Sequence, residues 1–302
     1  MSKLGSLKIT TIAENLVQAG GLGQWGLSFL LELQDTHGDY RKVLFDTAGH
    51  REAFLHNVKE KKIDLSDIDA VFISHGHWDH TATTADAVSQ AGGVKVYGHP
   101  LTFTPRWFIN QRGEKRTSGI NEGQGRAEIE AAGGELVLSS DPVEIVPGLW
   151  TTGEIDKVTS FEGVNPPRAG TKRFFLVDGD EVTDLIQDDM AVWADVEGAG
   201  PYVITGCAHS GPVNTVLQAQ RLGGFESIAG LVGGTHLIGR TDEYLNATIH
   251  ELKKFGFKMI SPCHCTGFKA TVILMNAFPE EFVLNFCNRE IEAGKMPKDR
   301  VR

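Results

Sequence analysis

Three histidines and an aspartate lie within six positions of this chain, in the segment His75-Gly-His77-Trp-Asp79-His80. Several imidazoles and a carboxylate are costly to bury together without partners, and divalent cations can satisfy them all. In an extended segment His75 and His77 point to the same side, whereas Asp79 and His80 follow a turn at the start of a helix. The spacing therefore indicates two neighbouring metal positions, for which Zn²⁺ is the first choice and Mn²⁺ or Fe²⁺ are alternatives.

The segment resembles the H-x-H-x-D-H signature of the metallo-β-lactamase superfamily. The other segments that match, in the expected order, are Phe45-Asp46-Thr-Ala-Gly, Gly206-Cys-Ala-His209-Ser-Gly and Pro262-Cys-His264-Cys-Thr-Gly. The resemblance covers nearly the whole chain and implies one α/β domain over residues 1–302, a four-layer αββα sandwich with the metals at one edge. It implies six ligands, which are His75, His77 and His209 for the first metal and Asp79, His80 and His264 for the second. Asp46 would accept a ring N–H from a metal-bound histidine and fix its orientation.

The chain departs from the family where many binuclear members have an aspartate that bridges the metals. The corresponding segment reads Leu-Val-Gly-Gly234-Thr-His236 and has no carboxylate, so the occupancy of the second position is left open. His236 is either a further ligand, an acid or base that faces the substrate, or a hydrogen-bonded loop residue. Cysteine sulfur also binds Zn²⁺. Cys207, Cys263 and Cys265 are therefore alternative thiolate ligands, although ligation is not the favoured interpretation for any of them. We expect Cys263 and Cys265 to pack behind the site, because in extended backbone they point away from the face that His264 presents.

A narrower resemblance rests on Gly-Cys-Ala-His-Ser-Gly, Gly-Gly-Thr-His-Leu and Cys-His-Cys-Thr-Gly. Together these segments are similar to a subgroup named 7,8-dihydropterin-6-methyl-4-(β-D-ribofuranosyl)aminobenzene-5′-phosphate synthase, which points to a phosphate- or pterin-like substrate. In that subgroup, Gln187-Asp188-Asp189-Met-Ala resembles an acidic element close to the metals. Asp189 is therefore a candidate catalytic residue, with a plain turn between strands as the alternative.

A metal ion lowers the pKa of a bound water toward neutrality and so supplies hydroxide. We expect a metal-dependent hydrolase whose hydroxide attacks a phosphoester or ester, with Asp79 orienting the nucleophile and a protonated His236 donating to the leaving group. The first alternative is a synthase that condenses a dihydropterin diphosphate with a ribosyl-aminobenzene phosphate, as in methanopterin-type biosynthesis. The second alternative is a non-catalytic effector that only binds a ligand.

Residues 98–126 are rich in glycine and proline and read as a long excursion, which in a compact domain is more often a binding lid than a spacer. Arg106, Trp107 and Arg116 lie in it. Guanidinium groups suit phosphate or carboxylate oxygens, and an indole can stack on a flat ring. A small anionic substrate is therefore expected, with a solvated, self-paired surface loop as the alternative.

Runs of β-branched and aromatic residues predict the strands that carry these loops, at 8–13, 27–33, 42–45, 70–74, 94–97, 135–138, 174–177, 191–194, 202–205, 228–232 and 258–261. Apolar residues at three- and four-residue steps predict helices over 50–61, 81–91, 213–222, 242–255 and 269–278. Three strands precede the first helix, which fits two stacked sheets better than a doubly wound one. Gly21-Leu-Gly23-Gln-Trp-Gly26 matches a dinucleotide-binding pattern but leads into a strand, so we expect a loop that borders the site.

The chain has 29 Lys and Arg against 39 Asp and Glu, a net charge of −10, which argues against non-specific nucleic-acid binding. No apolar N-terminal region and no continuous apolar stretch of membrane-spanning length is present, so we expect a cytoplasmic protein that does not insert into a membrane. Four cysteines are too few to staple a chain of 302 residues, which favours reduced thiols. A homo-oligomer is left open.

Overall fold

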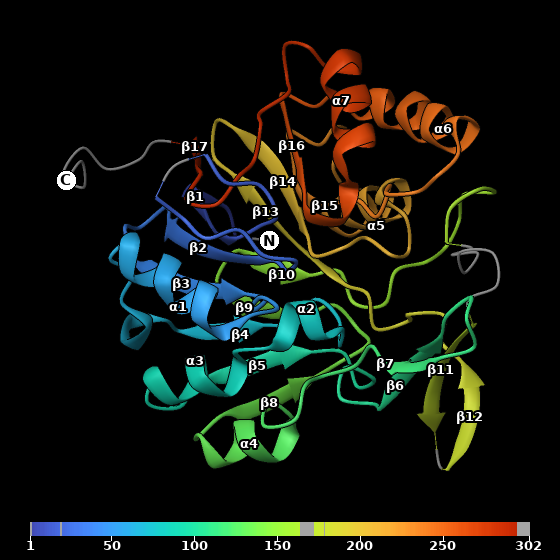
Figure 1. The fold of residues 1–302 in the computed structure, drawn as a ribbon. Helices are drawn as coiled ribbons and strands as arrows, with labels where there is room; N and C mark the ends of the chain where they lie inside the picture. The colour runs from blue at the N-terminus through green and yellow to red at the C-terminus, as the bar shows by residue number, and fades with distance from the viewer. Residues whose placement is uncertain (1, 19, 164–171, 178, 295–302) are drawn as a thin grey trace.

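Two layers of β-strands lie face to face between two layers of helices (Figure 1). The computed structural model describes residues 2–18, 20–163, 172–177 and 179–294. Within these ranges, one continuous sheet of 13 strands folds over where β1 (Leu4–Ala13) meets β13 (Ala191–Val196) at the register pair Leu4–Val196. The architecture is the four-layer αββα sandwich that the resemblance implied.

The first layer consists of the N-terminal strands. From β1 its order is β2 (Ser28–Asp35), β3 (Tyr40–Phe45), β4 (Ala70–Phe72), β5 (Lys95–Gly98) and β8 (Glu135–Leu138). The pairs β1–β2 and β2–β3 are antiparallel, whereas β3, β4, β5 and β8 run parallel. Parallel strands end at the same edge of a sheet, so the loops after β3 and β4 come together there.

The second layer consists of C-terminal strands. From β13 its order is β14 (Gly200–Thr205), β15 (Gly230–Gly234) and β16 (Met259–Cys263), and the last three run parallel. The short strands that branch from the two layers are β9 (Glu144–Val146), β10 (Leu149–Thr151) and β17 (Glu290–Gly294). The loops after β14, β15 and β16 therefore also share one edge.

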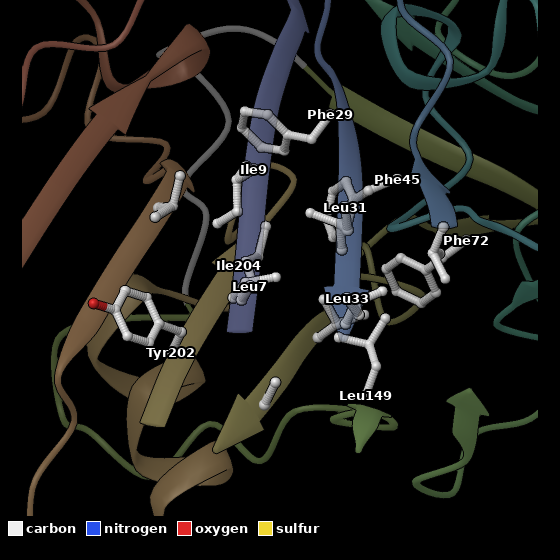
Figure 2. Packing of buried hydrophobic residues seen from close by; sticks show 14 of the residues in the cluster. Leu7, Ile9, Phe29, Leu31, Leu33, Phe45, Phe72, Leu149, Tyr202 and Ile204 are labelled. Atoms are coloured by element: carbon white, nitrogen blue, oxygen red, sulfur yellow. The ribbon is translucent and has the colours of Figure 1, made fainter. Parts of the chain in front are cut away.

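Apolar side chains from both layers form the core between them (Figure 2). Leu7, Ile9 and Leu31 lie on one face of β1 and β2, as the two-residue period of a strand requires, and pack in one cluster with Ile204 of β14. Each is fully buried. Burial of a side chain of this size contributes about 1.5–3 kcal/mol, so the core holds the two layers, and with them the two sets of loops, in a fixed relation.

Helices close both outer faces (Figure 1). Those on the first layer are α1 (Arg51–Glu60), α3 (Thr84–Gln90) and α4 (Arg126–Ala131), and those on the second are α5 (Pro212–Gly223), α6 (Asp242–Leu252) and α7 (Phe268–Ala277). The helix predicted over 242–255 ends as an α-helix at Leu252 and continues as the 3₁₀ turn Lys253–Phe255. No helix among the described residues has the length and apolar composition that a membrane span needs.

A separate four-stranded antiparallel sheet stands beside the sandwich (Figure 1), and we call it the small sheet. Its order is β12 (Asp180–Thr183), β11 (Lys172–Val177), β6 (Arg106–Ile109) and β7 (Lys115–Thr117). The excursion at 98–126, expected to be irregular, thus supplies two of these strands. β6 pairs with β11, whose residue Lys172 lies opposite Ile109. The sequence pattern did not show this pairing because the partner comes so much later in the chain.

Candidate metal centre

His75, His77 and His209 bring three ring nitrogens together at the edge where the strands end. His75 Nε2 lies 2.9 Å from His77 Nδ1 and 3.2 Å from His209 Nε2. Burial, together with the imidazoles of His80 and His77, keeps the pKa of His75 well below its usual range, and burial lowers the pKa of His77 to about 3. These rings are therefore neutral near pH 7, which is the form that binds a cation.

Asp79, His80 and His264 form a second group beside the first. One donor atom from each lies within 4.8 Å of the others, and His264 Nε2 is 3.5 Å from Asp79 Oδ2. Burial opposes the charge on Asp79, but the nearby His80 and His264 keep the pKa of this carboxyl below its usual range. The rings of His75 and His80 are 4.2 Å apart between centroids, so the two groups are adjacent.

Asp46 fixes the orientation of His80 directly and that of His75 through Ser74. Its Oδ2 accepts from His80 Nδ1 at 2.6 Å and from Ser74 Oγ at 2.7 Å, and its Oδ1 accepts the Ser74 backbone N–H. Ser74 Oγ in turn lies 2.9 Å from His75 Nδ1. With both Nδ1 atoms committed, Nε2 of His75 and of His80 face the site. This is the position that the resemblance implied for Asp46.

Local backbone geometry explains why the ligands can converge. His77 is extended, and the short helix α2 (Trp78–Thr81) begins directly after it. Asp79 and His80 lie in this helical turn, so their side chains leave the backbone in other directions than those of the extended residues before them. His264 lies in the 3₁₀ turn His264–Thr266 with φ of +53°, and its backbone N–H donates to Glu14 Oε1 at 2.8 Å. Positive φ is unfavourable for a residue with a side chain, so surrounding contacts must hold this turn.

Asp188 and Asp189 support the loops that carry His75 and His77 and that carry His209, respectively. Asp188 Oδ2 accepts the backbone N–H of Gly76 at 2.7 Å, between two ligands, and Asp189 Oδ2 accepts that of Ser210 at 2.8 Å. Burial raises the pKa of Asp189 to about 6. Asp189 thus lies against the backbone next to His209. The two consecutive acids ahead of an apolar strand are a sequence signal for both residues, whereas the resemblance points to Asp189 alone.

Arg106 completes this support. Its guanidinium, fully buried, holds Asp188 through Nη1 at 3.1 Å and Nη2 at 2.7 Å. This side chain was predicted to bind substrate, and the structure places it behind the metal centre, paired with a carboxylate. It also connects β6 of the small sheet to the loop that carries His75 and His77.

His236 follows β15 and lies beside the first group. Its ring centroid is 4.1 Å from that of His209, its φ is +47°, and its Nδ1 is buried without a hydrogen-bond partner among the described residues. Gly234, two residues earlier, leaves no room for a carboxylate. A Cβ there would lie 2.2 Å from the backbone oxygen of Gly206 and 2.8 Å from Cys265 Sγ.

The cysteines divide into two kinds. Cys263 packs into the core, as expected. Cys265 instead turns toward the site, where its Sγ accepts the His236 backbone N–H at 3.3 Å, because the 3₁₀ turn replaces the extended backbone assumed from sequence. Cys207 Sγ lies 3.2 Å from His80 Nε2, and burial raises the pKa of this thiol well above its usual range.

A cavity of about 560 Å³ opens over both groups. Its lining includes His77, Asp79, Cys207, His209, His236 and Cys265, and above them Trp25, Trp78, Phe108, Arg112, Arg116 and Arg173. Arg116 thus faces the cavity, where it pairs with Glu114 at 2.9 Å. Trp107 does not, since adjacent strand residues point to opposite faces, and its ring packs on Phe174. Trp25 confirms that the glycine-rich loop before β2 borders the site.

The donor set fits divalent cations. Four imidazoles whose pKa burial lowers, an ionised carboxylate and a buried unpaired nitrogen on His236 converge within 4.8 Å in overlapping groups; the four are those of His75, His77, His209 and His264. Burial opposes a charge on His80, but Asp46 and Asp79 raise the pKa of this ring, so it would give up a proton when a cation binds. Nitrogen and oxygen donors of this kind suit Zn²⁺ and also Mn²⁺ or Fe²⁺. His75, His77 and His209 would hold one ion, and Asp79, His80 and His264 the other.

Comparison with known proteins agrees with this geometry. Residues 26–211 match the family described as the metallo-beta-lactamase superfamily. A Methanocaldococcus jannaschii protein named 7,8-dihydropterin-6-methyl-4-(beta-D-ribofuranosyl)-aminobenzene-5'-phosphate synthase is 33% identical over 301 residues, 99% of this chain and 98% of that one. An uncharacterized protein of the same organism is 29% identical over 87% of this chain and 91% of its own. A solved structure described as a metal-dependent hydrolase of the beta-lactamase superfamily has a TM-score of 0.77 and 24% identity, covering 96% of this chain and 100% of that one. The chain therefore belongs to the metallo-β-lactamase superfamily.

Proposed function

We propose that this protein is a metal-dependent hydrolase that acts on a phosphoester of a small, ring-bearing anion. The observation that carries the proposal is the composition of the cavity that the metal donors line. Arg112, Arg116 and Arg173 line it together with three aromatic rings and the imidazoles of His77, His209 and His236. Guanidinium groups match phosphate oxygens, and rings stack on a flat substrate. A volume of about 560 Å³ suits one small molecule.

When bound, the metal ions would lower the pKa of a coordinated water and stabilise negative charge on the substrate oxygens. The protein supplies the rest. Asp46 and Asp188 keep His80 and the loop of His75 and His77 in place, so that little reorganisation is needed during reaction. The arginines would bind the phosphate and set its orientation. The Asp79 carboxylate, held ionised, can orient the nucleophile and accept its proton.

His236 is the candidate for proton transfer at the leaving group. Burial and the charges of Arg173 and Arg240 hold its pKa well below the usual range. The ring would therefore enter the reaction neutral, and it could protonate the leaving group only after taking up the proton that the nucleophile releases, rather than start as the imidazolium expected from sequence. Asp189 acts as a positioning residue in this scheme, because its carboxylate accepts the backbone N–H of Ser210, the residue after His209.

A second candidate function is the condensation of a dihydropterin diphosphate with a ribosyl-aminobenzene phosphate. The relative that is 33% identical over nearly the full length carries the name of such a synthase. The same metal donors and arginines would then bind a diphosphate leaving group, and the attacking group would come from a second organic substrate instead of water.

One experiment separates these functions. The full chain is loaded with Zn²⁺ or Mn²⁺ and incubated with phosphomonoesters, phosphodiesters and a dihydropterin diphosphate, with and without the ribosyl-aminobenzene phosphate. Phosphate release without a second organic substrate supports the hydrolase. Release of pyrophosphate only when both substrates are present supports the synthase. If nothing turns over while a ligand still raises the melting temperature, the protein is a binding effector and the enzyme proposal fails.

A further inference from the structure

We propose that the thiol of Cys207 supplies a sulfur donor shared by the two metal positions. The inference rests on the metal centre of the proposed function, but not on the reaction assigned to it. It concerns a residue that the six-ligand set leaves out. Many family members have a bridging aspartate at the end of the strand that here ends in Gly234. Cys207, which follows β14 instead of β15, would supply a bridging group from the neighbouring strand.

The position of Cys207 Sγ is the first argument. In separate groups its sulfur lies within 4.8 Å of a donor atom of His75 and of His80, of His209 and His236, and of His264 and Cys265. It is therefore close to donors of both metal positions. Its distance to His80 Nε2 is 3.2 Å. Nitrogen and sulfur ligands of one tetrahedral Zn²⁺ lie about 3.3–3.8 Å apart, so the observed spacing is close to that of two ligands of one ion.

The second argument is that the backbone holds this sulfur in place. Cys207 follows β14 directly after Gly206, where a Cβ would meet Ser74 Oγ at 2.0 Å, so the strand end packs tightly against the Asp46–Ser74 contact. The next residue, Ala208, has φ of +52°, a turn that brings His209 back toward the site. Cys207 is 3% exposed and lines the cavity.

The other three cysteines serve as internal comparisons. Cys287 Sγ donates to the backbone oxygens of Glu14 at 3.2 Å and Leu22 at 3.5 Å, and Cys263 lies in the core. Cys265 Sγ, although near the site, accepts the His236 N–H and donates to the Cys207 backbone oxygen at 3.5 Å. Cys265 Sγ also lies within 4.8 Å of a His264 donor atom, but Cys207 is the one of the four whose sulfur lies at hydrogen-bond distance from a ring nitrogen of the candidate ligands.

A sulfur donor changes which metals the site prefers. Thiolate favours Zn²⁺ and other borderline-soft ions, whereas Mn²⁺ favours oxygen ligands. We therefore expect Zn²⁺ and Co²⁺ to bind more tightly than Mn²⁺, and this preference to shrink when the sulfur is replaced by oxygen.

The test uses Co²⁺, because a thiolate bound to Co²⁺ absorbs in the near ultraviolet, independently of any catalytic activity. The metal-free full chain is titrated with Co²⁺, and bound metal per chain is measured in parallel. Wild type should bind two equivalents and show the thiolate band. Cys207→Ser should lose the band and bind the second equivalent at least about tenfold more weakly. Cys265→Ser and Cys287→Ser, the matched controls, should keep it.

A misfolded Cys207→Ser variant would not leave the question undecided. Zn²⁺ X-ray absorption on the wild type should show a sulfur neighbour at about 2.3 Å, and Cys207→Asp should keep two equivalents without the sulfur signal. Two bound Co²⁺ ions without a thiolate band in the wild type overturn the inference and leave the proposed function standing. So does a band that survives in Cys207→Ser or disappears only in Cys265→Ser. If the wild type binds no Co²⁺, the metal centre itself fails, and with it the proposed function.

Discussion

The floor and the wall of the cavity are built in opposite ways. The floor is the set of six candidate metal ligands, and each of its loops is held by a buried carboxylate, such as Asp46 at His80 or Asp188 at Gly76. The wall is formed by β6 and β7 of the small sheet together with Arg173. There Arg116 and Glu114 pair while their side chains remain 62% and 45% exposed.

This difference assigns different tasks to the two regions. A buried carboxylate with several donors holds its partners in one geometry, which catalysis at a metal requires. An exposed ion pair is worth little and reorganises easily, so the wall can adjust to a substrate at small cost. Under the proposed function, the floor would therefore determine the chemistry, and the wall would determine which substrate it acts on.

The largest effect should come from breaking the floor. His77→Ala removes one of three nitrogens that converge on the first position, so we expect turnover to fall by roughly four orders of magnitude and bound metal to drop. Removing metal with a chelator should have the same effect and be reversed by adding Zn²⁺. His37→Ala is the control, because His37 is exposed and lies in a turn after β2. Equal turnover in both variants would show that this centre does not do the chemistry.

The next effect tests the connection between floor and wall. Arg106→Ala leaves the Asp188 carboxylate buried without its guanidinium partner, so we expect the free energy of unfolding to fall by about 3–5 kcal/mol. Metal affinity should fall too, because Asp188 holds Gly76 between two ligands. Denaturant titration and metal titration measure the two effects. Arg116→Ala, in the same sheet but exposed, should change neither by comparison, and a similar loss in both variants would remove the distinction between the regions.

The floor was the more predictable region, because its ligands lie close together in sequence. The spacing of His75, His77, Asp79 and His80 in one short segment carries the information by itself. His209 and His264 come from distant loops, but each follows an apolar strand, so their convergence followed once the resemblance supplied a sandwich. The four-layer fold was predictable for the same reason, as the strand and helix patterns are local.

The wall was not predictable, because its structure depends on contacts between distant segments. Residues 98–126 look irregular until Lys172 of β11 pairs with Ile109, which sets the strand register and turns Trp107 away from the cavity. The burial of Arg106 likewise depends on Asp188, 82 positions later. The turn at His264 was unpredictable for the same reason, since the contact that holds its positive φ comes from Glu14, near the other end of the chain.

A pH measurement compares carboxyls of the two regions. In the floor, burial raises the pKa of Asp189 from 3.8 to about 6, so between these values the folded state binds more protons than the unfolded one. Stability from this group is thus greatest below pH 3.8 and is lost as the pH rises through about 6. In metal-free protein, the excess stability of wild type over Asp189→Asn should shrink by roughly 2–3 kcal/mol between pH 4 and pH 7. Denaturant unfolding at several pH values measures it, and an excess that grows with pH would contradict the sign.

The matched carboxyl in the wall is Glu114. Hydrogen bonds from Asn110 and Arg116 lower its pKa, and it is solvent-exposed, so Glu114→Gln should leave the pH dependence of stability between pH 4 and pH 7 unchanged. A change as large as that of Asp189→Asn would mean that the wall is as firmly held as the floor.

The smallest effect is expected at the wall itself. Arg116 faces the cavity and is mostly exposed, so a contact from its guanidinium to a substrate phosphate should be worth about 1 kcal/mol. Arg116→Ala should therefore raise KM for an anionic substrate roughly fivefold to tenfold and leave kcat nearly unchanged, because the metal donors below are untouched. Arg41→Ala, an exposed arginine on β3 outside the cavity, is the control. If KM for every anionic substrate stayed the same in Arg116→Ala while kcat fell, Arg116 would belong to the chemistry of the floor rather than to the selection of the substrate by the wall.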